Sequence, residues 1–142
     1  MKCAEVMKRT VECLLEDDTV EEAARRMRDA NIGFLPVCDI NRRVVGTLTD
    51  RDIAIRVAAE NLVAGECVVG TVMSADVISC AAEDELADAE GLMGQHRKSR
   101  IVIVDGDGVI QGVISLSDVV GRESPRRASM TMREVTSREM RL

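Results

Sequence analysis

The chain has 142 residues, 46% hydrophobic and 31% charged, which is the composition of a globular domain. Its formal net charge is −6; the tail Arg122 to Leu142 contributes +3 through six Arg and three Glu, so the body before it carries −9. An acidic body with one Phe and no Trp or Tyr has neither a basic footprint nor stacking platforms, so we expect no binding to nucleic acid.

Segments that would place the chain in or across a membrane are missing from the sequence pattern. No apolar run approaches the ~20 residues that a membrane helix needs. The first nine residues lack the apolar core of a signal peptide. We therefore expect a cytoplasmic protein with no membrane partner.

The cysteines do not form a metal-binding pattern. The five (Cys3, Cys13, Cys38, Cys67, Cys80) contain no C-x-x-C pair, and His96 is the only histidine. We expect no metal site and interpret the cysteines as reduced structural thiols, because intracellular cysteines rarely pair.

The first half of the chain predicts the order strand, helix, strand, strand, helix. A strand is expected over Thr10 to Leu15, and Thr19-x-x-Glu22 forms a capping box that begins a helix. The apolar face of that helix comprises Val20, Ala23, Ala24, Met27 and Ala30. Two strands, Phe34 to Cys38 and Val44 to Leu48, follow, and a second helix begins after Thr49.

The second half predicts the same order after a linker from Asn61 to Gly70. The expected elements are a strand at Val77 to Cys80, a helix at Glu83 to Gln95, strands at Ile101 to Val104 and Val109 to Ile114, and a short helix from Ser117. The turn Asp105-Gly-Asp-Gly108 lacks the later ligands of a calcium loop and is interpreted as a hairpin turn.

The tail from 122 to 142 is polar and Arg-rich. It predicts one amphipathic helix from about Ala128, with weak order at its end. Its arginines at 126, 127, 133 and 138 are expected either to fold onto acidic surface or to meet an acidic partner; a solvated end is the alternative.

The two halves match one another at a fixed spacing of 66 residues without a gap. The shift places Val6-Met7 on Val72-Met73, Gly46 on Gly112, and Asp52 on Asp118. A fixed period indicates a repeated structural unit. Each unit is too short to bury a full core alone, so we expect two units with pseudo-two-fold symmetry and paired, equivalent clefts.

One motif occurs at the same place in both repeats. It reads Gly46-Thr-Leu-Thr49-Asp-Arg-Asp52 in the first repeat and Gly112-Val-Ile-Ser115-Leu-Ser-Asp118 in the second. The hydroxyl and the acid three residues later form a variant capping box. The same groups at a helix start also suit a ribose that carries a phosphate, because free N–H groups attract phosphate and a carboxylate accepts two hydrogen bonds from a diol. Two equivalent copies favour binding, but capping stays open.

This duplicated unit, with its Val-Met openings and closing Gly-x-x-[Thr/Ser]-x-x-Asp, resembles the cystathionine β-synthase (CBS) domain family. The resemblance implies an α/β (α+β) fold of two packed repeats, at about 6–60 and 72–121, in a CBS pair over 1–121. It also implies that adenosine nucleotides bind in clefts between the repeats. Asp52 and Asp118 would then hold ribose hydroxyls, and Thr49 and Ser115 would approach phosphate.

The resemblance further implies which other residues form the binding sites. The residues around adenine would be Thr10, Val11, Ile32, Gly33, Phe34, Asp76, Val77, Ser99, Arg100 and Ile101. Arg51 is included in the site, and the number of phosphates held depends on where Arg51, Arg56, Arg97, Lys98 and Arg100 point. Lys98-Ser99-Arg100 replaces the apolar Ile32-Gly33-Phe34, so the second cleft is expected to be more polar.

These features predict a regulatory module rather than an enzyme, because His96 has no nucleophile at a catalytic spacing. The expected ligand is AMP, ADP, ATP or NAD, and the expected signal passes to a separate protein. A homodimer is expected through apolar helix faces at Ala54, Val57, Ala58, Val119 and Val120. The alternative is a protein-interaction module whose clefts are vestigial and bind no ligand.

Overall fold

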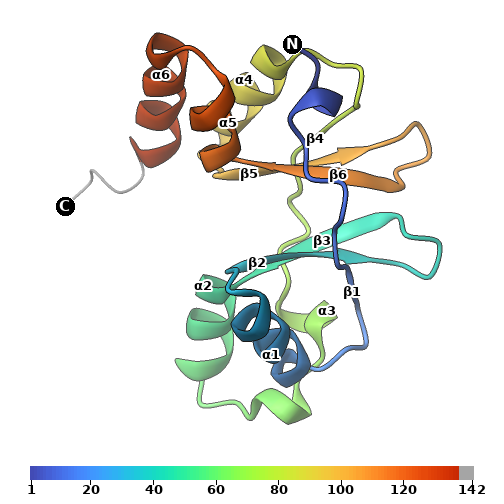
Figure 1. The fold of residues 1–142 in the computed structure, drawn as a ribbon. Helices are drawn as coiled ribbons and strands as arrows, with labels where there is room; N and C mark the ends of the chain where they lie inside the picture. The colour runs from blue at the N-terminus through green and yellow to red at the C-terminus, as the bar shows by residue number, and fades with distance from the viewer. Residues whose placement is uncertain (138–142) are drawn as a thin grey trace. The chain divides into compact units, whose positions relative to one another are not determined.

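The computed structural model describes residues 1–137, which form two compact units (Figure 1). The central unit is Glu12–Val77. The terminal unit comprises Met1–Val11 and the chain from Ile78 onward. The units therefore do not coincide with the sequence repeats, because the opening segment of the first repeat packs with the elements of the second.

The central unit is a three-stranded sheet with helices. Its strands lie in the order β1-β2-β3, with β1 parallel to β2 and β2 antiparallel to β3. Its elements are β1 (Leu14–Leu15), α1 (Val20–Ala30), β2 (Phe34–Cys38), β3 (Val44–Thr49), α2 (Asp50–Ile53) continued by a π-helical turn (Ala54–Ala58), a 3₁₀ turn (Ala64–Glu66) and α3 (Val69–Val72). The core gathers Leu14, Val20, Ala23, Leu35, Val37, Leu48 and Val69.

The terminal unit repeats this plan and adds a helix. Its sheet has the order β4-β5-β6 with the same strand directions. Its elements are a 3₁₀ turn (Cys3–Glu5), β4 (Ser79–Cys80), α4 (Leu86–His96), β5 (Arg100–Val104), β6 (Ile110–Ser115), α5 (Leu116–Arg122) and α6 (Pro125–Thr136). The core gathers Cys3, Val6, Leu86, Met93, Ile101, Ile103, Ile114 and Val119. The predicted α/β class and element order are therefore confirmed.

The first strand is shorter than predicted. β1 has two residues, as β4 has, and Pro36 accounts for its start one residue later than the equivalent of β4. In the terminal unit, Ser79 pairs with Val102, whose N–H donates to the Ile78 carbonyl at 3.3 Å. The equivalent of Val102 in the central unit is Pro36, which has no N–H to donate. The ladder between β1 and β2 therefore begins at Leu14, and Thr10 to Cys13 lie outside it.

The cap of α1 is half of the predicted box. The Thr19 hydroxyl accepts from the Glu22 N–H at 3.1 Å, but the Glu22 carboxylate pairs with Arg26 at 3.2 Å instead of reaching back. On the predicted inward face Val20, Ala23 and Met27 are buried, whereas Ala24 is half-buried and Ala30 exposed.

The predicted linker and tail are more structured than expected. The 3₁₀ turn Ala64–Glu66 lies inside the predicted linker, and α3 begins at the linker's end, where Val69 is fully buried. α6 begins at Pro125 rather than Ala128, because Ser124 caps the helix and proline suits its first turn. Residue Arg138 of the tail prediction lies outside the described residues. Within residues 1–137, none of the helices combines the length and the apolar character required to cross a bilayer.

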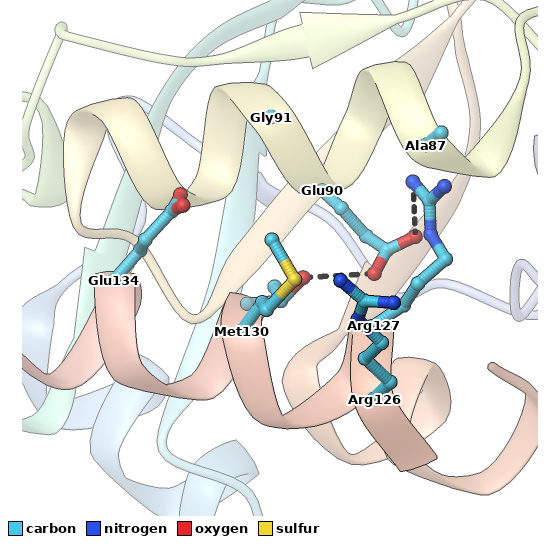
Figure 2. A pocket seen from close by; sticks show the side chains of 8 residues that line it. Ala87, Glu90, Gly91, Arg126, Arg127, Met130 and Glu134 are labelled. Atoms are coloured by element: carbon cyan, nitrogen blue, oxygen red, sulfur yellow. Dashed lines mark hydrogen bonds and ion pairs between the residues drawn. The ribbon is translucent and has the colours of Figure 1, made fainter. Parts of the chain in front are cut away.

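α6 packs against α4 around a buried carboxyl group, Glu90 of α4, which Figure 2 shows pointing toward α6. Glu90 is only 4% exposed. Its Oε1 accepts from the Thr131 hydroxyl at 2.8 Å, and Arg127 Nη2 lies 3.9 Å from its Oε2. Arg127 Nε also lies 3.4 Å from Glu123 Oε2. The part of the tail prediction that placed arginines on acidic surface is therefore confirmed for Arg127.

Burial and a hydrogen bond to Glu123 raise the pKa of Glu90 from 4.5 to about 7. The same hydrogen bond lowers the pKa of Glu123. Glu90 Oε2 has no hydrogen-bond partner among the described residues, and a buried oxygen without a partner disfavours the charged carboxylate. Arg127 and Thr131 on α6 contact this carboxyl group, and Arg126 and Glu134 line the open side of the pocket around it.

The docking of α6 should therefore weaken as the pH rises. Because the folded pKa of Glu90 exceeds the unfolded value of 4.5, the native state binds more protons between pH 4.5 and about 7. The free energy of unfolding should fall across that window by roughly 1–3 kcal/mol and level off above it. Chemical denaturation between pH 5 and 8.5 measures this slope.

The matched variants are Glu90→Gln, which is neutral and keeps the size and an N–H donor, and exposed Glu83→Gln as control. Glu90→Gln should flatten the slope, and Glu83→Gln should retain it. A slope that is unchanged in Glu90→Gln would contradict the assignment of the proton to this pair.

Candidate functional site

The motif of the first repeat forms the junction between β3 and α2. The Thr49 hydroxyl accepts from the Asp52 N–H at 3.1 Å, and Asp52 Oδ2 accepts from the Thr49 N–H at 2.9 Å. This is a complete capping box, so the capping interpretation is confirmed at this position.

Only one oxygen of Asp52 is used by the cap. Oδ1 lies 3.9 Å from Arg56 Nε, one helical turn later, and the side chain is 17% exposed. Arg56 is itself held by the carbonyls of Val72 and Met73, at 3.0 and 3.1 Å from its Nη1. The carboxylate is therefore fixed through Oδ2, while Oδ1 faces a guanidinium at ion-pair distance and keeps acceptor capacity.

The segment before β2 lies directly beside this junction. Phe34 is the strand partner of Thr49, and the Asp50 N–H donates to the Gly33 carbonyl at 3.0 Å. A Cβ on Gly33 would come within 2.5 Å of Asp50 Oδ2, so a larger residue there would require the exposed Asp50 side chain to move. The structure thus brings Ile32, Gly33 and Phe34 to the start of α2, as the sequence predicted for one site.

The glycine of the motif marks where another segment crosses β3. Thr47 and Ser74 exchange two backbone hydrogen bonds, both of 2.9 Å. A Cβ on Gly46 would lie 2.6 Å from Met73 Sδ and 2.8 Å from the Ser74 carbonyl oxygen. The Val-Met opening of the second repeat therefore packs on the glycine of the first, and it leads to Asp76 and Val77 within the central unit.

The terminal unit has the same junction between β6 and α5. The Ser115 hydroxyl accepts from the Asp118 N–H at 3.2 Å, and Asp118 Oδ2 accepts from the Ser115 N–H at 2.9 Å. The Ser115 hydroxyl also donates to Asp118 Oδ2 at 2.8 Å. Asp118 is again 17% exposed, and its Oδ1 lies 3.7 Å from Lys8 Nζ. A cation thus stands beside the second oxygen of each acid.

The crossing segment is equivalent as well. Lys8 and Val113 exchange backbone hydrogen bonds of 3.0 and 3.1 Å, and a Cβ on Gly112 would lie 2.8 Å from the Lys8 carbonyl oxygen. This segment continues into Thr10 and Val11. On the other side, Arg100 is the strand partner of Ser115, and the Leu116 N–H donates to the Ser99 carbonyl at 2.8 Å.

The predicted site residues divide between the two units, and the division does not follow the repeats. Thr10 and Val11 of the first repeat belong to the terminal unit, and Asp76 and Val77 of the second repeat belong to the central unit. The central unit holds Ile32, Gly33, Phe34, Thr49, Arg51, Asp52, Asp76 and Val77, and the terminal unit holds Thr10, Val11, Ser99, Arg100, Ile101, Ser115 and Asp118. The Ile101 side chain is fully buried in its core, so only its backbone remains available to a ligand. Arg51 is exposed on α2.

The predicted site did not include Lys8, whose ion pair with Asp118 spans most of the chain. No spacing in the sequence signals this contact. Arg56 was predicted only as one of five cations that could face phosphate, although its position four residues after Asp52 on a helix is a recognisable ion-pair spacing.

Two of the residues predicted for an apolar dimer face do not lie on a surface. Val57 and Val119 are 3% and 0% exposed, because they pack into the cores of their own units. Their part in the predicted interface is therefore wrong. Ala54, Ala58 and Val120 are exposed, and Ile55 is 48% exposed beside the first two.

Comparison with known proteins decides the family. The model of the CBS domain matches residues 3–59 and 69–124. The chain belongs to the CBS domain family. Among its relatives, the CBS domain-containing protein YhcV of Bacillus subtilis is 38% identical over 103 residues, covering 72% of this chain and 71% of that protein.

Solved structures of CBS proteins share the fold. Hypoxic Response Protein I, whose crystal structure holds two coordinated zinc ions, superposes with a TM-score of 0.78 at 27% identity, covering 88% of this chain and all of that one. PAE2072 of Pyrobaculum aerophilum, complexed with AMP, superposes with a TM-score of 0.79 at 22% identity, covering 93% of this chain and 98% of that one. The second likeness concerns the fold alone.

Proposed function

We propose that this CBS protein is a regulatory module that binds adenosine nucleotides and reports their level to a separate protein. The observation that carries the proposal is the pair of equivalent acids, Asp52 and Asp118. Each is fixed by a capping box through Oδ2 and keeps Oδ1 beside a cation.

The geometry suits a ribose that carries a phosphate. Oδ1 of each acid has acceptor capacity for a hydroxyl of a cis-diol, and the neighbouring cation suits phosphate oxygens. In this proposal Asp52 and Asp118 hold ribose hydroxyls, and Thr49 and Ser115 approach phosphate. Arg56 and Lys8 are the added cations, and exposed Arg51 is a third candidate.

The segments beside each acid supply the adenine contacts. They are Ile32, Gly33, Phe34, Asp76 and Val77 in the central unit, and Thr10, Val11, Ser99, Arg100 and the backbone of Ile101 in the terminal unit. AMP, which PAE2072 binds, is the first candidate ligand, followed by ADP, ATP and NAD. The proposed location is the cytoplasm, and the protein is proposed to act without catalysis.

Ligand binding can be tested by thermal unfolding with AMP, ADP, ATP, NAD or S-adenosylmethionine at millimolar concentration. A ligand that binds only the native state raises the melting temperature. We expect at least one of the five to do so. If none does, the protein is instead a protein-interaction module with vestigial clefts.

Calorimetric titration of the ligand that shifts the melting temperature most then tests the acids. Asp52→Ala and Asp118→Ala should each weaken one of two binding events by about tenfold or more, the loss expected for charged hydrogen bonds of roughly 1.5–3 kcal/mol. The control is Asp107→Ala, an exposed acid in the β5–β6 turn, which should leave affinity unchanged. Equal affinities in all three variants would contradict the proposed roles.

We also propose a homodimer through the exposed residues Ala54, Ile55 and Ala58. Dimerisation would remove this small apolar surface from water. Light scattering at tens of micromolar should give a mass of about 31 kDa, twice the 15.5 kDa of one chain. Ile55→Glu should shift the mass toward the monomer, and Ile40→Glu on the hairpin loop, which is 86% exposed, should not. A wild-type monomer would contradict this assembly.

A further inference from the structure

A cavity of about 430 Å³ lies between α4 and α6 of the terminal unit (Figure 2). Small-molecule sites in proteins have volumes of roughly 300–1,000 Å³, so this cavity is large enough for a small metabolite. Among the described residues that line it, none belongs to the proposed nucleotide sites. The cavity is therefore a candidate site for a second kind of ligand.

The floor of the cavity consists of two small residues of α4, Ala87 and Gly91. A Cβ added to Gly91 would meet no atom within 4 Å outside its own helix backbone and its chain neighbours. The equivalent positions on α1 are Glu21 and Arg25, which form an ion pair of 2.5 Å one helical turn apart. The first repeat thus covers with side chains the helix face that the second repeat leaves open beside α6.

One wall of the cavity holds a buried carboxyl group with an oxygen that lacks a donor. Glu90 is 4% exposed, and Figure 2 shows its side chain pointing from α4 toward α6. The Thr131 hydroxyl donates to Oε1 at 2.8 Å. Oε2 has no hydrogen-bond partner among the described residues, and the nearest cation, Arg127 Nη2, lies 3.9 Å away. Because an unpaired buried acceptor is costly, a ligand that donates a hydrogen bond to Oε2 is favoured.

The other charged groups around the cavity indicate the charge of that ligand. Arg127 is already paired with Glu123, whose Oε2 lies 3.4 Å from its Nε. Arg126 and Glu134 form no ion pair within residues 1–137. The groups that remain for a ligand are one guanidinium, Arg126, and two carboxyl groups, Glu90 and Glu134. A ligand with one carboxylate and two cationic groups complements them.

We propose that this pocket binds a free basic α-amino acid with a flexible aliphatic chain, for which lysine is the simplest probe. Its α-ammonium group donates to Glu90 Oε2, and its α-carboxylate accepts hydrogen bonds from Arg126. Its side-chain cation pairs with Glu134. Figure 2 shows Met130 between Glu90 and Glu134, where the adaptable methionine side chain covers the methylene groups that join the two cations. This inference does not depend on nucleotide binding.

Calorimetric titration of the full-length protein with L-lysine at millimolar concentration is the direct test, and we expect one site per chain. Three analogues each lack one recognised group: L-norleucine lacks the side-chain ammonium, ε-aminocaproate the α-ammonium, and cadaverine the carboxylate. Each analogue should bind at least about tenfold more weakly than lysine, the loss expected for one charged hydrogen bond. Failure of L-lysine to bind, or equal binding of lysine and cadaverine, would overturn the proposal.

Substitutions at the three polar residues should match the three analogues. Glu134→Gln should weaken the binding of lysine by about tenfold and leave norleucine unaffected, because norleucine has no group for Glu134 to contact. In the same way, Arg126→Gln should spare cadaverine, and Glu90→Gln should spare ε-aminocaproate. A substitution that weakens lysine and its matched analogue equally acts through the fold, and that outcome contradicts the assigned contact.

Gly91→Leu tests the location of the site. The leucine side chain enters the open space beside Gly91 and should abolish lysine binding, while the loss of a helical glycine should keep or raise the melting temperature. The matched control is Gly121→Leu on α5, where an added Cβ also meets no atom within 4 Å, and it should bind lysine as wild type does. Lysine binding retained in folded Gly91→Leu would overturn the location. If Gly91→Leu does not fold, the exposed positions Arg126 and Glu134 keep the test decisive.

Discussion

The reciprocal hydrogen bonds between a hydroxyl residue and an acid three positions later determine much of this structure. At Thr49–Asp52 and Ser115–Asp118 they end a half-buried strand, begin a helix, and fix the rotation of a carboxylate. Capping and ligand binding were competing interpretations of the sequence. In the structure the cap uses Oδ2 of each acid and leaves Oδ1 beside a cation, so the proposed ligand contact is compatible with the cap. A cap that already orders the acid also lowers the entropy cost of using it to bind a ligand.

The opening segment of each repeat packs in the unit that holds the motif of the other repeat. Met7 packs on Gly112 and Met73 on Gly46, so each motif glycine is required by the opening segment of the other repeat. Because a Cβ at either glycine would collide with backbone oxygen, the contact tolerates no larger residue without a shift of the chain. The same exchange delivers Lys8 to Asp118, so the cation beside that acid comes from the far end of the sequence.

The sequence predicted the element order and the two junctions because both depend on local patterns. Each of these patterns lies within a few consecutive residues of the sequence: the alternation of a strand, the periodicity of a helix, and a cap residue with an acid three positions later. The sequence could not predict contacts that depend on chain path, such as Lys8 with Asp118 or Met73 on Gly46. It also misplaced Val57 and Val119, because an apolar residue on a short helix faces either its own core or a partner, and periodicity alone does not say which. Pro36 in the sequence did indicate the later start of β1, since proline removes a ladder donor.

The central claim is that one oxygen of each acid serves the fold and the other serves the ligand. The double variant Asp52→Asn, Asp118→Asn tests it, because an amide oxygen still accepts the cap hydrogen bond while the amide nitrogen replaces the free oxygen with a donor. Calorimetric titration with the best adenosine ligand, alongside thermal melts, is the measurement. The account predicts affinity at least about tenfold weaker with a melting temperature within about 4 °C of wild type. Unchanged affinity in this variant would contradict it.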